Sequence, residues 1–289
     1  MTFEERVLQF SCHGASLLGI LSLPVKSPAA GVLIVVGGPQ YRAGSHRQFT
    51  LLARTLASQG VPVMRFDYRG MGDSEGAARS FEQIDDDLRC AIDHFFEQAA
   101  GLKTVVIWGL CDAASAALFY AHRDPRVNGL VLLNPWVRSA QSVAKAHLKH
   151  YYVARLFTAG FWKKIVSGRF DIFAAGRSFQ RMVGDAFFKK NTDSSGDAID
   201  GDDGRNVALH DRMADGLSRF GGKVLLILSG EDLTAREFSD VVRGSRRWRA
   251  LMNSSNVKRL DLPAANHTFS RREWRDKVAA WTLEWIDAL

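Results

Sequence analysis

Hydrophobic and polar positions alternate between two spacings along the first half of the chain. Short continuous apolar runs are typical of strands buried on both faces of a sheet, and they occur at 31–36, 61–66, 104–108 and 127–133. Apolar residues recur at helical spacing in the segments between them, at 45–59, 81–98 and 112–122. Ser45 is the expected N-cap of the first of these helices. Repeated strand–helix units predict an α/β fold, with a mostly parallel sheet and helices on both faces.

Two further patterns complete the predicted sheet. Residues 6–10 and 17–23 flank His13-Gly14 and predict a strand pair joined by a turn. The strand–helix alternation stops at Asn134-Pro135 and resumes near residue 223, with strand and helix patterns at 223–228, 238–253, 257–262 and 271–289.

The interruption predicts an insertion. We expect an α/β core formed by residues 1–134 and 223–289, with a helical cap inserted at 135–222. Two separate domains are the alternative, which is disfavoured because the second half alone contains only two strand patterns.

Composition excludes several classes of protein. With 46% hydrophobic and 24% charged residues, the chain is neither disordered, collagen-like nor a coiled coil. It contains no apolar run near the ~18 residues that span a bilayer. The N-terminus carries Glu4 and Glu5 where a signal peptide has basic residues, so a cytoplasmic location is expected. Three scattered cysteines, without CxxC or HExxH, indicate neither a disulfide framework nor a zinc site, and no metal or cofactor is expected.

The most informative segment is Gly109–Ala113, where a predicted strand runs directly into a helix. A residue on such a sharp turn points outward, and small neighbours let the chain turn. The positive end of the following helix would favour the thiolate form of Cys111. We therefore predict Cys111 as a nucleophile, whereas Cys12 and Cys90 are interpreted as buried structural cysteines.

This turn resembles the nucleophile elbow of the α/β-hydrolase fold, with Cys111 replacing the usual serine, as in dienelactone-hydrolase-like enzymes. The loop Asp67–Ser74 resembles the loop after the fourth strand of that fold. The chain departs from the pattern at Ala113, where glycine is usual.

The resemblance implies a catalytic triad in the chain order nucleophile, acid, histidine. His267 lies between the last predicted strand and the last helix, where this fold carries its histidine, and His46 is the alternative. Asp232 follows the strand after the insertion and is the implied acid. It lies two residues after Gly230, where many relatives have three, and Glu231 is its alternative.

An oxyanion hole with two backbone donors is also implied. One donor is the N–H of Asp112, directly after the nucleophile. The other comes from the loop Val36–Arg42, which resembles the family's His-Gly-x-Pro motif with Val36 in place of histidine. Gly38 is the expected donor because Pro39 has no N–H, and Gln40 is the alternative.

A closer resemblance rests on four motifs together, at Gly37–Arg42, Gly109–Ala113, Glu231–Thr234 and Asn266–Phe269. Together they resemble the exosortase A system-associated hydrolases, which are encoded beside bacterial exopolysaccharide and protein-sorting systems. The resemblance implies this context, but it does not imply a substrate.

The predicted cap is strongly basic. The whole chain has a net charge of +7, and Arg138–Lys190 contains 11 basic and 2 acidic residues with interleaved aromatic residues. This pattern fits an anionic membrane surface or an anionic substrate, while the alternative is a lid with solvated lysines. Residues 191–203 carry five acids and no bases and are interpreted as a linker. No nucleic-acid recognition motif is present, so nucleic acid is not an expected partner.

Two functions of different class follow from these motifs. The first is a hydrolase or acyltransferase that uses Cys111, His267 and Asp232 on a small-molecule or lipid-linked ester, thioester or lactone. It would be cytoplasmic, with peripheral association at the inner membrane as a further expectation. The second is a non-catalytic binding or scaffold protein of the same fold.

Overall fold

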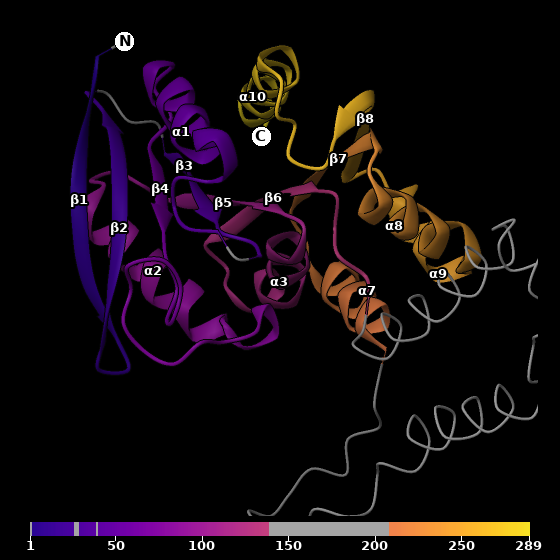
Figure 1. Ribbon diagram of the computed structural model, residues 1–289, viewed down its shortest axis with the longest axis horizontal. Coiled ribbons are helices and arrows are strands. Elements are labelled where there is room, and N and C mark those ends of the chain that lie inside the picture. The colour runs from indigo at the N-terminus through magenta and orange to yellow at the C-terminus, as the bar shows by residue number, and fades with distance from the viewer. Residues whose placement is uncertain (1, 26–28, 39, 139–207) are drawn as a thin grey trace, which may run out of the picture. The chain divides into compact units, whose positions relative to one another are not determined.

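Eight strands form one sheet in the computed structural model, which describes residues 2–25, 29–38, 40–138 and 208–289 (Figure 1). The strands are β1 (Phe3–Cys12), β2 (Ala15–Pro24), β3 (Ala30–Val35), β4 (Val63–Phe66), β5 (Thr104–Leu110), β6 (Val127–Leu133), β7 (Lys223–Glu231) and β8 (Val257–Asn266). Their order across the sheet is β1-β2-β4-β3-β5-β6-β7-β8. The pairs from β4 to β8 are all parallel, which confirms the predicted mostly parallel sheet.

The first two strands form an antiparallel hairpin, and β2 is also antiparallel to β4. His13 and Gly14 make the tight turn of the hairpin with φ values of 50° and 79°. The hairpin predicted around these two residues is therefore confirmed.

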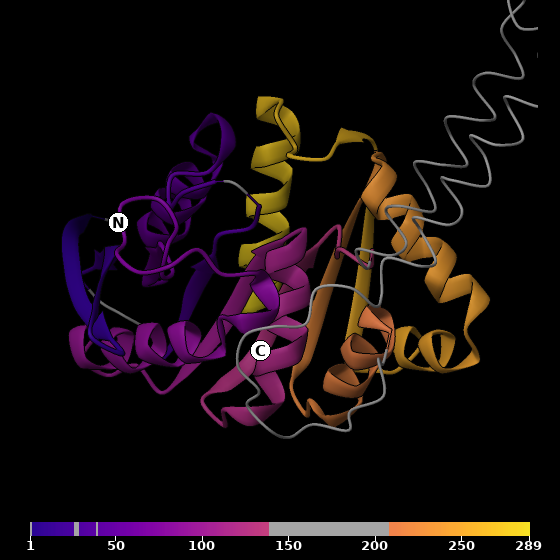
Figure 2. The same ribbon diagram turned by 60° about the horizontal axis from the view of Figure 1, so that its bottom comes forward.

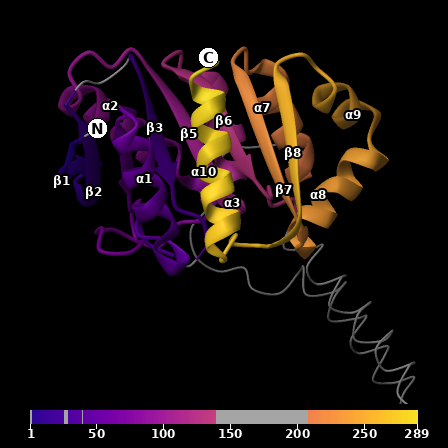
Figure 3. The ribbon, with the colours of Figure 1, turned by 90° about the horizontal axis from the view of Figure 1, so that it is seen from above.

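Seven α-helices of the described residues cover the two faces of the sheet. They are α1 (Gln48–Ser58), α2 (Asp85–Gln98), α3 (Asp112–Tyr120), α7 (Leu209–Arg219), α8 (Leu233–Gly244), α9 (Arg246–Met252) and α10 (Arg272–Ile286). Helices α1 and α10 pack on one face and the other five on the opposite face (Figures 2 and 3). Successive residues of β3 therefore contribute to opposite cores, with Leu33 in one and Ile34 in the other.

Two helix predictions were wrong in detail. Helix α1 begins at Gln48 after a 3₁₀ turn, so Ser45 is not its N-cap, and left-handed Arg47 (φ 59°) occupies that position. The helix predicted at 238–253 is two helices, because Ser245 leaves the helical conformation (φ −113°, ψ 124°). Its hydroxyl accepts the N–H of Trp248 at 3.3 Å and so begins α9.

Helix α7 belongs to the same compact unit as the sheet. This unit consists of Met1–Val137 and Ala208–Leu289. Gly216 of α7 lies so close to α3 that an added Cβ would be 1.9 Å from the carbonyl oxygen of Leu118. The other unit is Arg138–Val207. Of the predicted cap and linker, residues 139–207 lie outside the described part of the chain. In the part that is described, no helix is long and apolar enough to cross a membrane.

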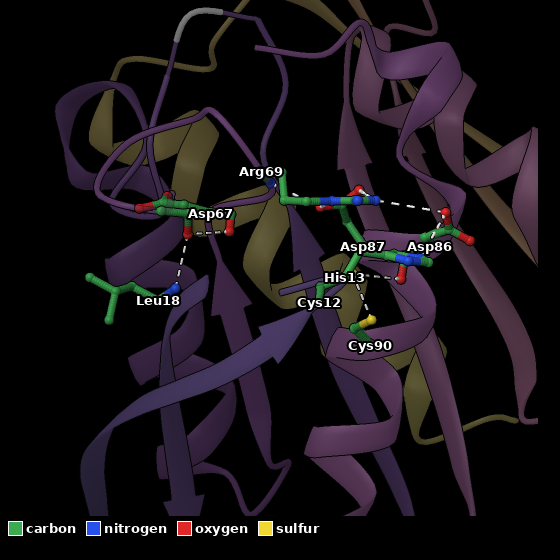
Figure 4. Close-up of polar contacts among 9 residues, drawn as sticks. Cys12, His13, Leu18, Asp67, Arg69, Asp86, Asp87 and Cys90 are labelled. Carbon is green, nitrogen blue, oxygen red and sulfur yellow. Dashed lines mark hydrogen bonds and ion pairs between the residues drawn. The ribbon is translucent and has the colours of Figure 1, made fainter. Parts of the chain in front are cut away.

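Buried polar contacts join the hairpin to α2 and to the loop after β4 (Figure 4). Arg69 donates from Nε and Nη2 to the buried Asp87 carboxylate, both at 2.9 Å. The Sγ atoms of Cys12 and Cys90 are 2.6 Å apart, and both residues are free cysteines. Burial and the neighbouring Cys90 raise the pKa of Cys12 to about 12, so Cys12 is a protonated thiol at neutral pH.

Candidate active site

Cys111 is the one residue between the end of β5 and the start of α3. Its backbone has φ 64° and ψ −123°, a region that residues other than glycine rarely adopt. Two hydrogen bonds fix this conformation. The Cys111 N–H donates to the carbonyl of Leu133 at 2.8 Å, and its carbonyl accepts the N–H of Trp136 at 3.2 Å.

The tight turn requires glycine at position 109. A Cβ added to Gly109 would lie 2.7 Å from the backbone of Ala113, closer than real Cβ atoms approach other atoms. Ala113 is itself fully buried at this contact. The turn thus accommodates Ala113, the residue that departs from the family pattern, because it is Gly109 that makes the close approach.

Asp232 and His267 meet at the carboxyl ends of β7 and β8. The Nδ1 atom of His267 is 2.9 Å from Oδ2 of Asp232. The same carboxylate accepts the N–H groups of Thr234 at 3.2 Å and Ala235 at 3.1 Å, so Asp232 is also the N-cap of α8. The helix therefore orients the carboxylate toward the imidazole.

The electrostatics of this pair favour a charged imidazole. The hydrogen bond that Nδ1 of His267 donates to Asp232 raises the pKa of His267 to about 10, and the nearby Cys111 side chain contributes next. Burial would raise the pKa of Asp232, but the hydrogen bond and charge of His267 keep it below its ordinary value. At neutral pH the pair is consequently an imidazolium and a carboxylate.

The structure brings Cys111, His267 and Asp232 together and leaves the two alternatives apart. His46 is exposed on the turn before α1. Glu231 is exposed at the end of β7, and His267 contacts Asp232 instead.

The predicted oxyanion donor at Gly38 already has a hydrogen-bond acceptor within the protein. The N–H of Gly38 donates to both carboxylate oxygens of Asp112, at 2.7 and 2.9 Å. The Asp112 carboxylate also accepts the N–H of Ala113 at 2.9 Å. The alternative donor, the N–H of Gln40, bonds to the carbonyl of Gly38 at 2.9 Å.

Asn134 is a site residue that the sequence interpretation missed. Fully buried after β6 with φ 44°, it donates from Nδ2 to Ser229 Oγ at 2.8 Å and to the His267 carbonyl at 3.1 Å. Its Oδ1 accepts the N–H of Ser229 at 2.9 Å. Asn134 thereby joins the ends of β6 and β7 to the His267 loop. The sequence does carry a signal for this residue, because Asn134 lies between a buried strand and Pro135, at the carboxyl edge of a parallel sheet.

The part of the chain that the structure describes contains no cluster of three or more histidine, cysteine or acidic residues able to hold a metal ion.

Comparison with known proteins gives the family and the fold. The family described as serine aminopeptidase, S33, matches residues 27–174. The lysophosphatidylserine lipase ABHD12 of Danio rerio is 37% identical over 78 residues, which are 27% of this chain and 19% of the lipase. This chain thus matches only about a fifth of that relative's length.

Two solved structures share the fold along nearly the whole chain. The Pyrococcus furiosus esterase Pf2001 has a TM-score of 0.65 at 14% identity and covers 99% of this chain and 91% of its own. Est1E from Butyrivibrio proteoclasticus, with ferulic acid bound, has a TM-score of 0.59 at 15% identity and covers 97% and 99%.

Proposed function

Because this chain belongs to the serine aminopeptidase S33 family and has the α/β-hydrolase fold, we propose that it cleaves an ester or thioester with a Cys111–His267–Asp232 triad. One observation carries the proposal. His267 bonds to Asp232 through Nδ1 at 2.9 Å, and the Cys111 side chain is near enough to help raise the pKa of His267. This supports an arrangement of nucleophile, base and orienting acid in the order that the reaction needs.

The geometry supports a two-step acyl transfer. Imidazolium His267 stabilises the thiolate of Cys111, which forms a bond to the carbonyl carbon while the carbonyl oxygen becomes an oxyanion. The intermediate expels the alcohol or thiol, which takes a proton from Nε2 of His267. Neutral His267 then removes a proton from water, which attacks the thioester and releases the acid and the thiolate. An acceptor other than water would make the same site an acyltransferase.

The proposed substrate is a small-molecule or lipid-linked ester or thioester. A lipase and an esterase among the similar proteins support this class. The four motifs that resemble exosortase A system-associated hydrolases support a role beside exopolysaccharide or protein-sorting systems.

A non-catalytic binding or scaffold protein remains the second candidate. The observation that favours it is the carboxylate of Asp112 on the N–H of Gly38, where a catalyst needs a free donor. The two candidates differ in what they require of Cys111, since a scaffold does not need a reactive thiolate.

The deciding experiment combines alkylation with turnover. We expect iodoacetamide to modify Cys111 at neutral pH at least about 10-fold faster than buried Cys12, which serves as the internal reference. His267→Ala should slow alkylation of Cys111. Short- and long-chain esters and thioesters should be hydrolysed by the wild type and not by Cys111→Ala. Equal alkylation of all three cysteines, with no turnover of any substrate, would support the scaffold.

The basic segment Arg138–Lys190 supports a further part of the proposal, association with anionic membrane surfaces. Vesicles containing anionic lipid should sediment the wild type more than Lys163→Glu/Lys164→Glu, and added salt should reduce the difference. Equal pelleting with neutral and anionic vesicles would exclude this association.

A further inference from the structure

The Asp112 carboxylate engages a donor that the family resemblance assigns to the oxyanion hole. An oxyanion hole is a set of N–H donors aimed at one point beside the nucleophile. Here the N–H groups of Gly38 and Ala113 converge on the side chain of Asp112, which directly follows Cys111.

The loop before Gly38 approaches the Asp112 carboxylate closely. A Cβ added at Gly37 would lie 2.5 Å from the carbonyl oxygen of Leu110 and 2.4 Å from Oδ1 of Asp112, so only glycine fits beside this backbone. At Gly38, by contrast, an added Cβ would meet nothing within 4 Å. Glycine at position 37 thus lets the loop approach both the Leu110 carbonyl and the Asp112 carboxylate.

Charged and titratable groups face Asp112 from three neighbouring elements. Burial raises the pKa of Asp112, while the N–H donors and the charge of His267 oppose this effect. Tyr68, after β4, lies close enough for the Asp112 charge to contribute to raising the tyrosine pKa to about 12. Cys111 is the third neighbour. A substrate oxyanion would therefore compete with an existing negative charge for the same donors.

We propose that Asp112 is an internal occupant of the oxyanion hole, and that a substrate carbonyl reacts only when the Asp112 carboxylate leaves the donors or becomes protonated. This inference rests on the proposed function, because it needs Cys111 as the nucleophile. Asp112 then determines which carbonyl compounds the site stabilises. Substrates that carry a negative charge beside the carbonyl are disfavoured, and neutral acyl groups are accepted.

The test compares Asp112→Ala and Asp112→Asn with the wild type, using two probes. The first is turnover of para-nitrophenyl butyrate. The second is an alkyl trifluoromethyl ketone, to which the Cys111 thiolate adds with formation of a C–S bond and an oxyanion, and with no leaving group. Asp85→Ala is the matched control, because Asp85 is likewise the first residue of a helix but belongs to α2, outside the triad. Thermal unfolding of each variant reports whether it is folded.

We expect Asp112→Ala to bind the ketone and to turn over the ester about 10-fold better than the wild type at neutral pH. Its advantage should shrink as the pH falls and Asp112 is protonated in the wild type. Asp112→Asn, which lacks the charge but still fills the space, should be intermediate, and Asp85→Ala should behave as the wild type. Equal or weaker ketone affinity in folded Asp112→Ala would overturn the inference. If no variant, wild type included, formed the adduct or turned over the ester, the proposed function itself would fail.

Discussion

Asn134 connects three segments of the site through its side chain. Its amide makes hydrogen bonds to Ser229 and to the carbonyl of His267, and it is fully buried. Asn134→Ala should therefore leave buried polar groups unpaired and lower the free energy of unfolding by about 1–3 kcal/mol. Because the His267 loop loses a positioning bond, kcat should fall more than KM rises.

Asn128 provides the control for this prediction. It lies on β6, which ends one residue before Asn134, and within the described residues its buried Oδ1 has no hydrogen-bond partner. Asn128→Ala should be nearly neutral in urea titrations and in turnover. A similar loss of stability in both variants would show that the bonds of Asn134 contribute little.

The positions of Cys111, Asp232 and His267 could be predicted because each follows a predicted strand, and parallel strands bring their carboxyl ends to one edge. The side-chain direction of Asp112 and the bonds of Asn134 could not. Both depend on hydrogen bonds between segments distant in sequence, which no local pattern of apolar positions records.

At the scale of elements, strands were predicted best, because burial on both faces produces continuous apolar runs. The break between α8 and α9 was missed since apolar residues continue at helical spacing across Gly244 and Ser245. Only the capping bond to Trp248 reveals where the second helix begins.

The hydrogen bond between Ser245 and Trp248 makes the break between α8 and α9 testable. Ser245→Ala should lower the free energy of unfolding by about 1 kcal/mol through loss of the N-cap of α9, while Ser245→Asp should preserve it. Thermal or urea unfolding measures both. If alanine and aspartate were equally stable, the hydroxyl of Ser245 would not stabilise α9.

At the scale of the whole molecule, the pairing of His267 with Asp232 makes stability depend on pH. Folding raises the pKa of His267 from 6.5 to about 10, so the folded state binds a proton that the unfolded state releases. The stabilisation is complete below about pH 6.5 and is lost as the pH rises toward 10. Because 34% of the side chain is exposed, the slope should stay below the ~1.4 kcal/mol per pH unit of a full proton.

Urea titrations between pH 7 and 9 measure this slope. His267→Gln should flatten it, whereas the wild type should lose stability steadily. The range ends at pH 9 because buried Cys12, whose pKa is also raised, adds a second loss at higher pH. A wild-type slope unchanged in His267→Gln would mean that other groups bind the proton.

The pairing of β6 with β7 also has a consequence for the order in which the molecule is made. These neighbours in the sheet are separated by about 90 residues of chain, which a ribosome adds in roughly 5–20 s. During that interval the nascent chain already carries Cys111 on its elbow, while the backbone edge of β6 is unpaired. Asp232 and His267 have not yet been synthesised, so the proposed nucleophile precedes its proposed partners. Those partners reach the site only when β7 and then β8, which are followed by Asp232 and His267, complete the sheet.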